Sequence, residues 1–204
     1  MSCPNTTKWC PRHGDYEFVA HRDAIVIATD GACRSNGRPH AQAGLGVFFH
    51  EDSNLNRADR VMDTAVHTSQ RAELHACLKA LDIALTIRRQ NPEGATSRLT
   101  QPAGPLRDLR RVVIKSDSKY LVDAMTNWRF TWWRDNAFRN SRGQLVANVD
   151  LFQDLEDAVD YLNDEYVSVQ FWHVPRGEND VADRLANAGV LNRDVDAVLR
   201  TYFG

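Results

Sequence analysis

The sequence lacks a long hydrophobic run. No apolar stretch approaches the roughly 20 residues that a membrane-spanning helix needs, and the N-terminal segment Met1–Asn5 has no basic region followed by apolar residues. These absences favour a soluble, intracellular protein that does not act on membranes. The nucleus and the cytoplasm are the expected locations, and the mitochondrion is an open alternative.

The sequence also lacks an excess of positive charge, and it has few cysteines. The formal net charge is −2, so any affinity for nucleic acid must come from a local patch of basic residues. Two of the four cysteines, Cys33 and Cys77, fall in expected core elements, which favours reduced thiols. Cys3, Cys10 and His13 are too widely spaced for a usual zinc knuckle, and no fourth ligand is evident.

What the chain does have is the composition of one globular domain. Its 204 residues are 43% apolar and 25% charged, enough for a single core. Residues 1–22 are predicted to form a polar tail and residues 23–204 one domain, expected to be monomeric. Residues 90–110 are rich in proline and glycine and read as a surface insertion.

The first half of the domain predicts strands followed by a helix. Apolar runs at 24–30, 43–49 and 61–66 indicate three antiparallel strands, with a polar turn at 50–60. Apolar residues at helical spacing then predict a helix from Ser69, as N-cap, to about Arg88. Small residues on one stripe of this helix would let it lie close to the sheet.

The second half predicts alternating strands and helices. Strands are expected at 112–117 and 166–172, and helices from about 118, over 151–162 and over 180–191. The resulting order is β-β-β-α-β-α-α-β-α. It indicates an α/β fold with a mixed five-stranded sheet flanked by helices.

Four acidic residues occupy positions suited to chemistry. Asp30 and Asp117 end apolar strands, where ligand sites of open α/β sheets commonly form, and Glu73 and Asp183 lie in helices beside small residues. Carboxylates that converge repel one another unless cations bind, and oxygen ligands suit Mg²⁺ or Mn²⁺. Taken singly, Asp117 could cap a helix, Asp183 could interact with a helix dipole, and Glu73 could be solvated.

The segments around these acids resemble the signatures of the type 1 ribonuclease H family. In chain order, the segments are Thr29–Gly37 followed by Ala43–Val47, then Gln70–Ala76, Ser116–Ser118 and Asn179–Ala186. Together they extend over roughly Ala24 to Gly189. The resemblance implies a ribonuclease H-like fold.

This resemblance implies an endonuclease that hydrolyses the RNA strand of RNA–DNA hybrids. Asp30, Glu73, Asp117 and Asp183 would hold two divalent metals, Mg²⁺ or in its place Mn²⁺, which stabilise the attacking and departing oxygens. The products would carry 5′-phosphate and 3′-hydroxyl ends.

The resemblance also implies substrate-binding residues. Asn36 and Gln70 would contact the 2′-hydroxyl of RNA, and Ser69 stands where the family usually has another Asn. Thr68 and Asn148 match a pocket for one DNA phosphate. The segment Asn127–Arg134, which includes Arg129, interleaves basic and aromatic residues and resembles the family's basic protrusion. It would grip the DNA strand through Trp128, Trp132 and Arg134, together with Arg139. Trp128 and Trp132 could alternatively be core residues.

One segment departs from the usual family pattern. The family often has a catalytic histidine in a mobile loop before the fourth signature, whereas here the segment is Phe171–Glu178. Its Pro175-Arg176 pair resembles a variant of eukaryotic, fungal-like relatives. The spacing to Asp183 favours His173 for the catalytic role, whereas alignment of the proline favours Arg176, so both remain candidates. Arg176 is also predicted to be a substrate-binding residue.

Two alternative functions share these features. One is a catalytically silent module that binds hybrids on the same fold. The other is a related metal-dependent nuclease, such as an integrase-like or exonuclease domain. The four acids oppose the first, and the signatures at Asp30-Gly31 and Gln70–Glu73 favour the hybrid nuclease over the second.

Overall fold

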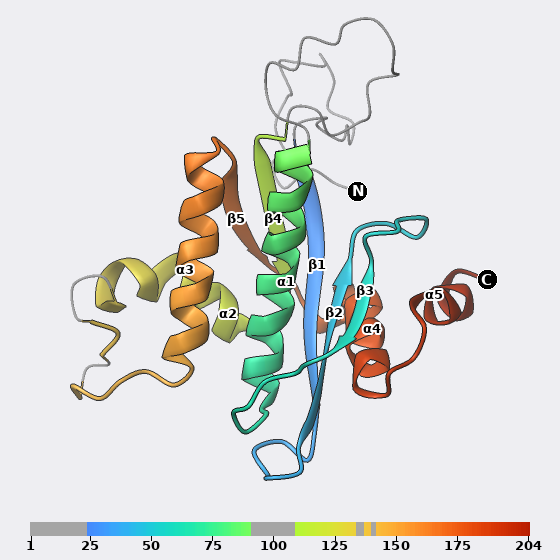
Figure 1. The fold of residues 1–204 in the computed structure, drawn as a ribbon, viewed down its shortest axis with the longest axis horizontal. Helices are drawn as coiled ribbons and strands as arrows, with labels where there is room; N and C mark the ends of the chain where they lie inside the picture. The colour runs from blue at the N-terminus through green and yellow to red at the C-terminus, as the bar shows by residue number, and fades with distance from the viewer. Residues whose placement is uncertain (1–23, 91–108, 134–136, 140–141) are drawn as a thin grey trace, which may run out of the picture.

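The computed structural model describes residues 24–90, 109–133, 137–139 and 142–204 (Figure 1). Five strands form one mixed sheet in the order β3-β2-β1-β4-β5. The strands are β1 (Ala24–Arg34), β2 (Gln42–Phe48), β3 (Arg57–Arg60), β4 (Arg111–Ser116) and β5 (Ser168–His173). The helices are α1 (Ser69–Gln90), α2 (Lys119–Asp123), the π-helix η1 (Ala124–Trp133), α3 (Val149–Asp164), the 3₁₀-helix η2 (Arg176–Glu178), α4 (Asp180–Val190) and α5 (Val195–Phe203). The predicted α/β fold with a mixed five-stranded sheet is confirmed.

The parallel pairing of β1 with β4 places the C-terminal end of β4 beside the middle of β1. β1 pairs in parallel with β4, and β4 with β5, whereas β1–β2 and β2–β3 are antiparallel. The β1–β4 register aligns Ala28 with Lys115. Two residues further along the chain are Asp30, within β1, and Asp117, directly after β4, so the register brings these two acids close together. β1 continues to Arg34, so the prediction that Asp30 ends its strand was wrong.

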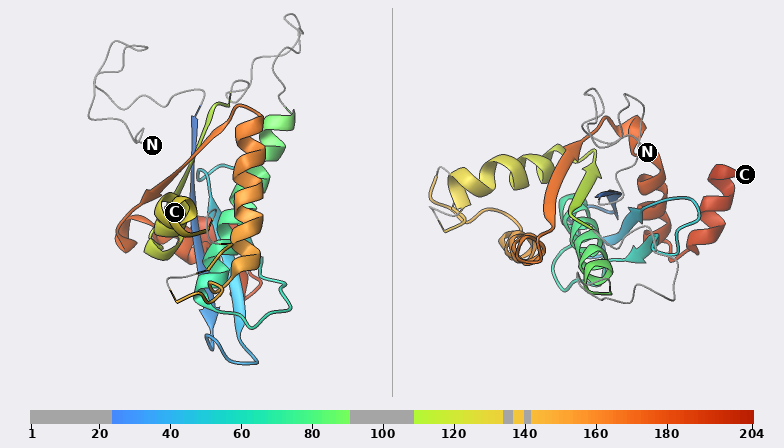
Figure 2. Two further views of the ribbon diagram at one scale, coloured as in Figure 1. Left: turned by 90° about the vertical axis from the view of Figure 1, so that its left-hand side faces the viewer. Right: turned by 90° about the horizontal axis from the view of Figure 1, so that it is seen from above.

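The sheet lies between two helical layers (Figure 2). α1 and α3 cover one face, where Ile27, Val112 and Ile114 join their apolar side chains in the core. α4 covers β1, β2 and β3 on the other face. Central strands that are apolar on both faces are expected when helices cover both sides of a parallel pairing.

The N-cap of the first helix lies one residue earlier than predicted, so α1 begins at Ser69 itself. The Thr68 hydroxyl accepts a hydrogen bond from the Arg71 N–H at 3.2 Å, so Thr68, and not Ser69, caps α1. The prediction of Ser69 as N-cap was therefore wrong by one position. The helix itself is confirmed and continues to Gln90.

The third strand was predicted too far along the chain. β3 covers Arg57–Arg60 and not residues 61–66, because residues 57–60 pair with β2 from Val47 to Gly44. Val61 adds one hydrogen bond to Ala43 at 2.9 Å, after which the chain leaves the sheet. The apolar pattern misled here because β3 is a short edge strand with mostly polar residues.

The insertion and the last helix also differ from the prediction. Leu109 is buried, so the predicted insertion at 90–110 ends before it, and residues 91–108 lie outside the described part of the chain. α5 was not predicted; Asp194 caps it by accepting from the Ala197 N–H at 3.0 Å.

The thiols of Cys33 and Cys77 are free, as predicted. Among the described residues, no helix combines the length and apolar character that a membrane span requires.

Candidate active site

Four secondary-structure elements carry the four predicted acids. Asp30 lies in β1, Asp117 directly follows β4, Glu73 lies in the second turn of α1, and Asp183 lies in the first turn of α4. Asp30 is buried, with 7% of its surface exposed, and the other three are partly exposed. The acids therefore come from both helical layers and from the sheet between them.

Glycines in the strands allow the two helices to approach the acids. A Cβ atom at Gly31 would lie 2.1 Å from the Glu73 backbone N, so α1 lies against β1 at this point. Gly46, which pairs with Asp30, lies equally close to α4: a Cβ there would be 2.2 Å from the Ala182 carbonyl oxygen. Because any larger residue would push the helices away, these glycines bring Glu73 and Asp183 to the strand that carries Asp30.

Polar side chains hold the acids in place. The buried Asn179 side chain donates from Nδ2 to the Thr29 carbonyl oxygen at 3.0 Å and to Asp117 Oδ1 at 2.9 Å. The Ser118 hydroxyl donates to Glu73 Oε2. Asn179 and Ser118 were not predicted as site residues, although each lies inside a quoted family signature.

The acids interact electrostatically. The pKa of Asp30 is raised to about 8, first because burial removes water from its carboxyl group and then because the Asp117, Asp183 and Glu73 charges repel it, whereas the Gly31 N–H lowers it. The pKa of Glu73 is also raised, mainly by burial and further by Asp117, whereas the Ser118 hydrogen bond and Arg176 lower it. A nearby cation would favour the ionised carboxylates, so the site fits a cation-binding role.

The donor set fits divalent cations. All four predicted ligands offer carboxylate oxygens, which Mg²⁺ and Mn²⁺ prefer. The buried Asn179 Oδ1 has no hydrogen-bond partner and adds an oxygen acceptor beside Asp117. Among the described residues, the group of three or more His, Cys, Asp or Glu side chains with ligand atoms within 4.8 Å of one another is the exposed His50, Glu51 and Asp52, so no three of the four acids are that close together in this structure.

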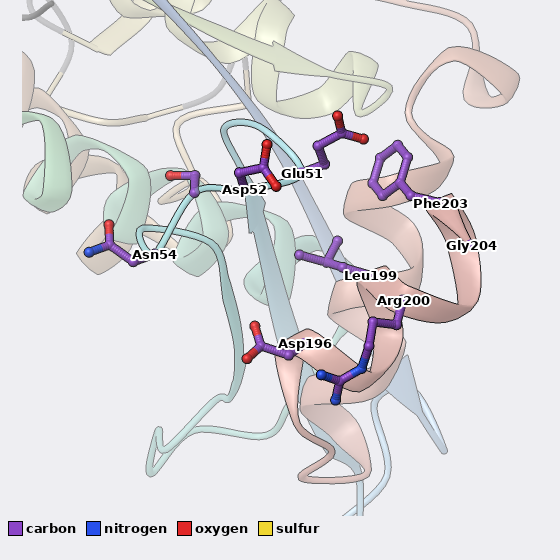
Figure 3. A pocket seen from close by; sticks show the side chains of 9 residues that line it. Glu51, Asp52, Asn54, Asp196, Leu199, Arg200, Phe203 and Gly204 are labelled. Atoms are coloured by element: carbon purple, nitrogen blue, oxygen red, sulfur yellow. The ribbon is translucent and has the colours of Figure 1, made fainter.

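The two pockets near α5 do not enclose the four acids. One, of about 420 Å³, lies between residues 51–54 and α5, and Figure 3 labels Glu51, Asp52 and Arg200 among its lining residues. None of the four acids lines it. The other, of about 450 Å³, lies between α4 and α5 and has Asp183 at one margin. The geometry of the carboxylates, not cavity size, defines the candidate active site.

The predicted RNA-contacting residues gather at the N-terminus of α1. Asn36 Oδ1 accepts from the Ser69 N–H at 3.0 Å, which ties the loop after β1 to the helix. Gln70 is exposed in the next position. Asn36, Ser69 and Gln70 therefore form a single polar surface at the start of α1, the helix that carries Glu73.

The two predicted phosphate-pocket residues, Thr68 and Asn148, are joined through Arg71. Thr68 Oγ1 accepts from the Arg71 backbone, and the Arg71 guanidinium donates to Asn148 Oδ1 at 3.3 Å. Arg71 is buried and also binds Asp63 and Asp150, each with a closest contact of 2.6 Å. The structure thus brings Thr68 and Asn148 together, although 80 positions separate them, and shows a supporting role for Arg71 that was not predicted.

The aromatic and basic segment after α2 is only partly described. Trp128 is half-buried, and its ring meets the Tyr120 ring edge-on at 5.9 Å. Arg139 is exposed and donates to the Gly143 carbonyl oxygen at 2.8 Å. The Trp132 side chain and all of Arg134 lie outside the described residues. Arg129, read with these residues as part of a basic surface, is instead buried against Glu156 and Asp160 of α3.

The two candidates for the catalytic loop residue are placed differently. His173 is exposed at the end of β5, where it pairs with Ser116. Arg176 begins η2, and its Nη2 donates to Asp183 Oδ1 at 3.2 Å. Of the two side chains, Arg176 is the one that the structure brings into contact with a predicted metal ligand.

Comparison with known families agrees with this arrangement. The family model described as RNase H matches residues 22–191 of the chain, which include all four acids. The chain belongs to the ribonuclease H family.

Ribonuclease H sequences from distant organisms are similar to the chain. Ribonuclease H1 of Mus musculus is 30% identical over 171 residues, which cover 82% of the chain and 50% of the mouse protein. Ribonuclease H of Treponema denticola is 30% identical over 162 residues, 79% of the chain and 94% of the bacterial protein. The chain thus spans about half the length of its mammalian ribonuclease H relatives.

A solved structure has a similar fold. The foamy viral protease-reverse transcriptase, solved in complex with an RNA/DNA hybrid, superposes with a TM-score of 0.55 at 20% identity. The superposition covers 84% of the chain and 20% of the viral protein. At this identity the likeness concerns the fold.

Proposed function

We propose that the chain is an endoribonuclease that hydrolyses the RNA strand of RNA–DNA hybrids and leaves 5′-phosphate and 3′-hydroxyl ends. The observation that carries the proposal is the arrangement of four carboxylates from β1, α1, β4 and α4, in which Glu73, Asp117 and Asp183 interact electrostatically with Asp30, in a member of the ribonuclease H family. The solved viral relative that binds an RNA/DNA hybrid has the same fold, which supports this class of substrate.

Asp30, Glu73, Asp117 and Asp183 are the proposed ligands of two Mg²⁺ ions, for which Mn²⁺ substitutes. Bound there, the ions would supply the positive charge that stabilises the attacking and departing oxygens of an in-line displacement. The chain's own residues set the geometry of the ligands. Ser118 fixes the Glu73 carboxylate and Asn179 fixes that of Asp117 through their hydrogen bonds.

Substrate selection is proposed to follow from two surfaces. The polar surface of Asn36, Ser69 and Gln70 offers donors and acceptors for the 2′-hydroxyl groups that distinguish RNA from DNA. Thr68 and Asn148, held together by Arg71, are proposed to bind a phosphate of the DNA strand. Further contacts to the DNA strand are assigned to Trp128, Trp132, Arg134 and Arg139.

A cleavage assay with matched substrates tests the proposal. An RNA–DNA hybrid, single-stranded RNA, duplex RNA and duplex DNA of the same sequence are end-labelled and incubated with Mg²⁺, with Mn²⁺ or with EDTA. We expect metal-dependent cleavage of the RNA strand of the hybrid alone. Binding of the hybrid without cleavage would indicate a silent hybrid-binding module, and cleavage of duplex DNA would indicate a different metal-dependent nuclease.

A further inference from the structure

Arg176 places a permanent positive charge against one of the proposed metal ligands. Its Nη2 lies 3.2 Å from Asp183 Oδ1, and the Arg176 side chain is 82% exposed. The residue begins η2, the short helix between β5 and α4. Because a guanidinium stays protonated at any pH the protein experiences, this charge does not depend on pH.

The charge of Arg176 acts on the whole carboxylate group. Besides its ion pair with Asp183, the guanidinium interacts electrostatically with Asp117 and Asp30, and it is among the groups that act on Glu73. The four carboxylates repel one another when they are ionised without cations. Arg176 is therefore located where it offsets part of this repulsion.

The Asp183 carboxylate has a second hydrogen-bond partner besides Arg176. Its other carboxylate oxygen, Oδ2, accepts from Asn187 Nδ2 at 3.3 Å, and the same amide donates to the Asp183 carbonyl oxygen at 2.9 Å. Asn187 lies one turn further along α4, on the same rigid element as Asp183. Departure of the exposed Arg176 side chain would leave this support intact and would free Oδ1.

We propose that Arg176 is the built-in counter-ion of the metal-free site and competes with a divalent cation for Asp183. The inference rests on the proposed function, because it takes Asp183 as a metal ligand. Metal binding at Asp183 then requires the guanidinium to leave Oδ1. Once released, the guanidinium is free to bind a phosphate of the substrate, the group that its planar fork of donors suits.

If Arg176 instead positioned Asp183 for the metal, removing Arg176 would change the metal affinity in the opposite direction. Its removal would then weaken metal binding, whereas removal of a competitor strengthens it. Mn²⁺ binding in the absence of nucleic acid distinguishes the competing role from the positioning role. Electron paramagnetic resonance of the free ion measures this binding. We expect Arg176→Gln to bind Mn²⁺ about two- to fivefold more tightly than the wild type at low ionic strength, the size expected for one exposed ion pair.

Arg184→Gln is the matched control. It removes the same charge from the residue next to Asp183, but the Arg184 guanidinium lies over the Tyr202 ring at 5.2 Å. We expect a smaller change in Mn²⁺ affinity for this variant, and near wild-type affinity for Arg176→Lys, which keeps the charge. Circular dichroism of Arg176→Gln checks that the exposed substitution leaves the fold unchanged.

Equal or weaker Mn²⁺ binding by Arg176→Gln would overturn the inference, as would an equal gain in Arg184→Gln. If the wild type still cleaves the hybrid in that case, the proposed function stands and only the role of Arg176 falls. If neither the wild type nor any variant binds Mn²⁺ or cleaves the hybrid, both the inference and the proposed function fail.

Discussion

Asp30 is a buried carboxyl group whose ionisation the fold opposes. Its pKa is raised from 3.8 to about 8 by burial and by the neighbouring acids. Between these pH values the folded carboxyl holds a proton that the unfolded one has lost, so the free energy of unfolding falls as pH rises from about 4 to about 8. Bound divalent cations would reverse this effect, because they stabilise the ionised form.

We expect Asp30→Asn to make the metal-free protein more stable than the wild type at pH 8, by about 1–3 kcal/mol. Near pH 3 the difference should largely disappear, because both the folded and the unfolded Asp30 are then mostly protonated. Urea unfolding in EDTA at the two pH values measures this. A difference of the same size at both pH values would show that the charge of Asp30 is not its cause.

Asn179 links the two central strands beside the acids. Asn179→Ala removes the donor to both the Thr29 carbonyl oxygen and Asp117, so we expect a loss of about 1–3 kcal/mol in stability and weaker Mn²⁺ binding. Thermal unfolding and Mn²⁺ titration measure the two effects. Asn163→Ala, at an exposed position of α3, is the control and should change neither.

At the scale of elements, glycines decide how closely the helices approach the sheet. Gly31→Ala would place a Cβ 2.1 Å from the backbone of α1, and such overpacking costs about 1–3 kcal/mol or more. Because the helix must shift away, Glu73 should move from the site and hybrid cleavage should fall at least tenfold. Thermal unfolding and the cleavage rate test both effects.

Gly177→Ala is the control for Gly31→Ala, because a Cβ at Gly177 would meet no atom within 4 Å. It should leave stability within about 0.5 kcal/mol of the wild type. If the two variants lost equal stability, close helix–sheet contact at Gly31 would not be the reason for its glycine.

The elements differ in how well the sequence predicts them. β1 and β4 could be predicted from continuous apolar runs, and α1 and α4 from apolar residues at helical spacing. β3 could not, because its four residues are mostly polar and pair only at the sheet edge. The segment predicted as one helix after Ser118 continues from α2 as a π-helix, a hydrogen-bonding change that side-chain periodicity does not reveal.

The candidate active site, like the fold, could be predicted only in part from the sequence. The four acids could be found because each lies in a short family signature, and Asp117 also directly follows a strand. The contacts of Arg71 with Asp63 and Asp150 could not, since they depend on how a loop, α1 and α3 meet in space. Arg129 was misread for the same reason, because spacing alone does not show that α3 covers it.

At the scale of the whole molecule, a net charge of −2 requires that hybrid binding depend on a local set of cations. The proposed set includes Arg134 and Arg139. The intracellular location, the monomeric state and the division at residue 22 stay predictions at this scale.

We expect Arg134→Ala to weaken hybrid binding and to lower the slope of affinity against salt concentration by about one charge. Fluorescence anisotropy with a labelled hybrid at several salt concentrations measures both. Arg200→Ala is the control, because Arg200 is exposed on α5 beside the pocket of Figure 3. A slope that changes equally in the two variants would argue against a specific contact by Arg134.

The central claim is that the carboxylates of β1, α1, β4 and α4 act together as one metal-dependent nuclease site. The most direct measurement compares the rate of hybrid cleavage in Mg²⁺ by the wild type, Asp117→Asn and Asp123→Asn, a neighbouring acid on α2. We expect Asp117→Asn to lose at least a hundredfold in rate with its fold intact, and Asp123→Asn to retain wild-type activity. Near wild-type cleavage by Asp117→Asn would contradict the account.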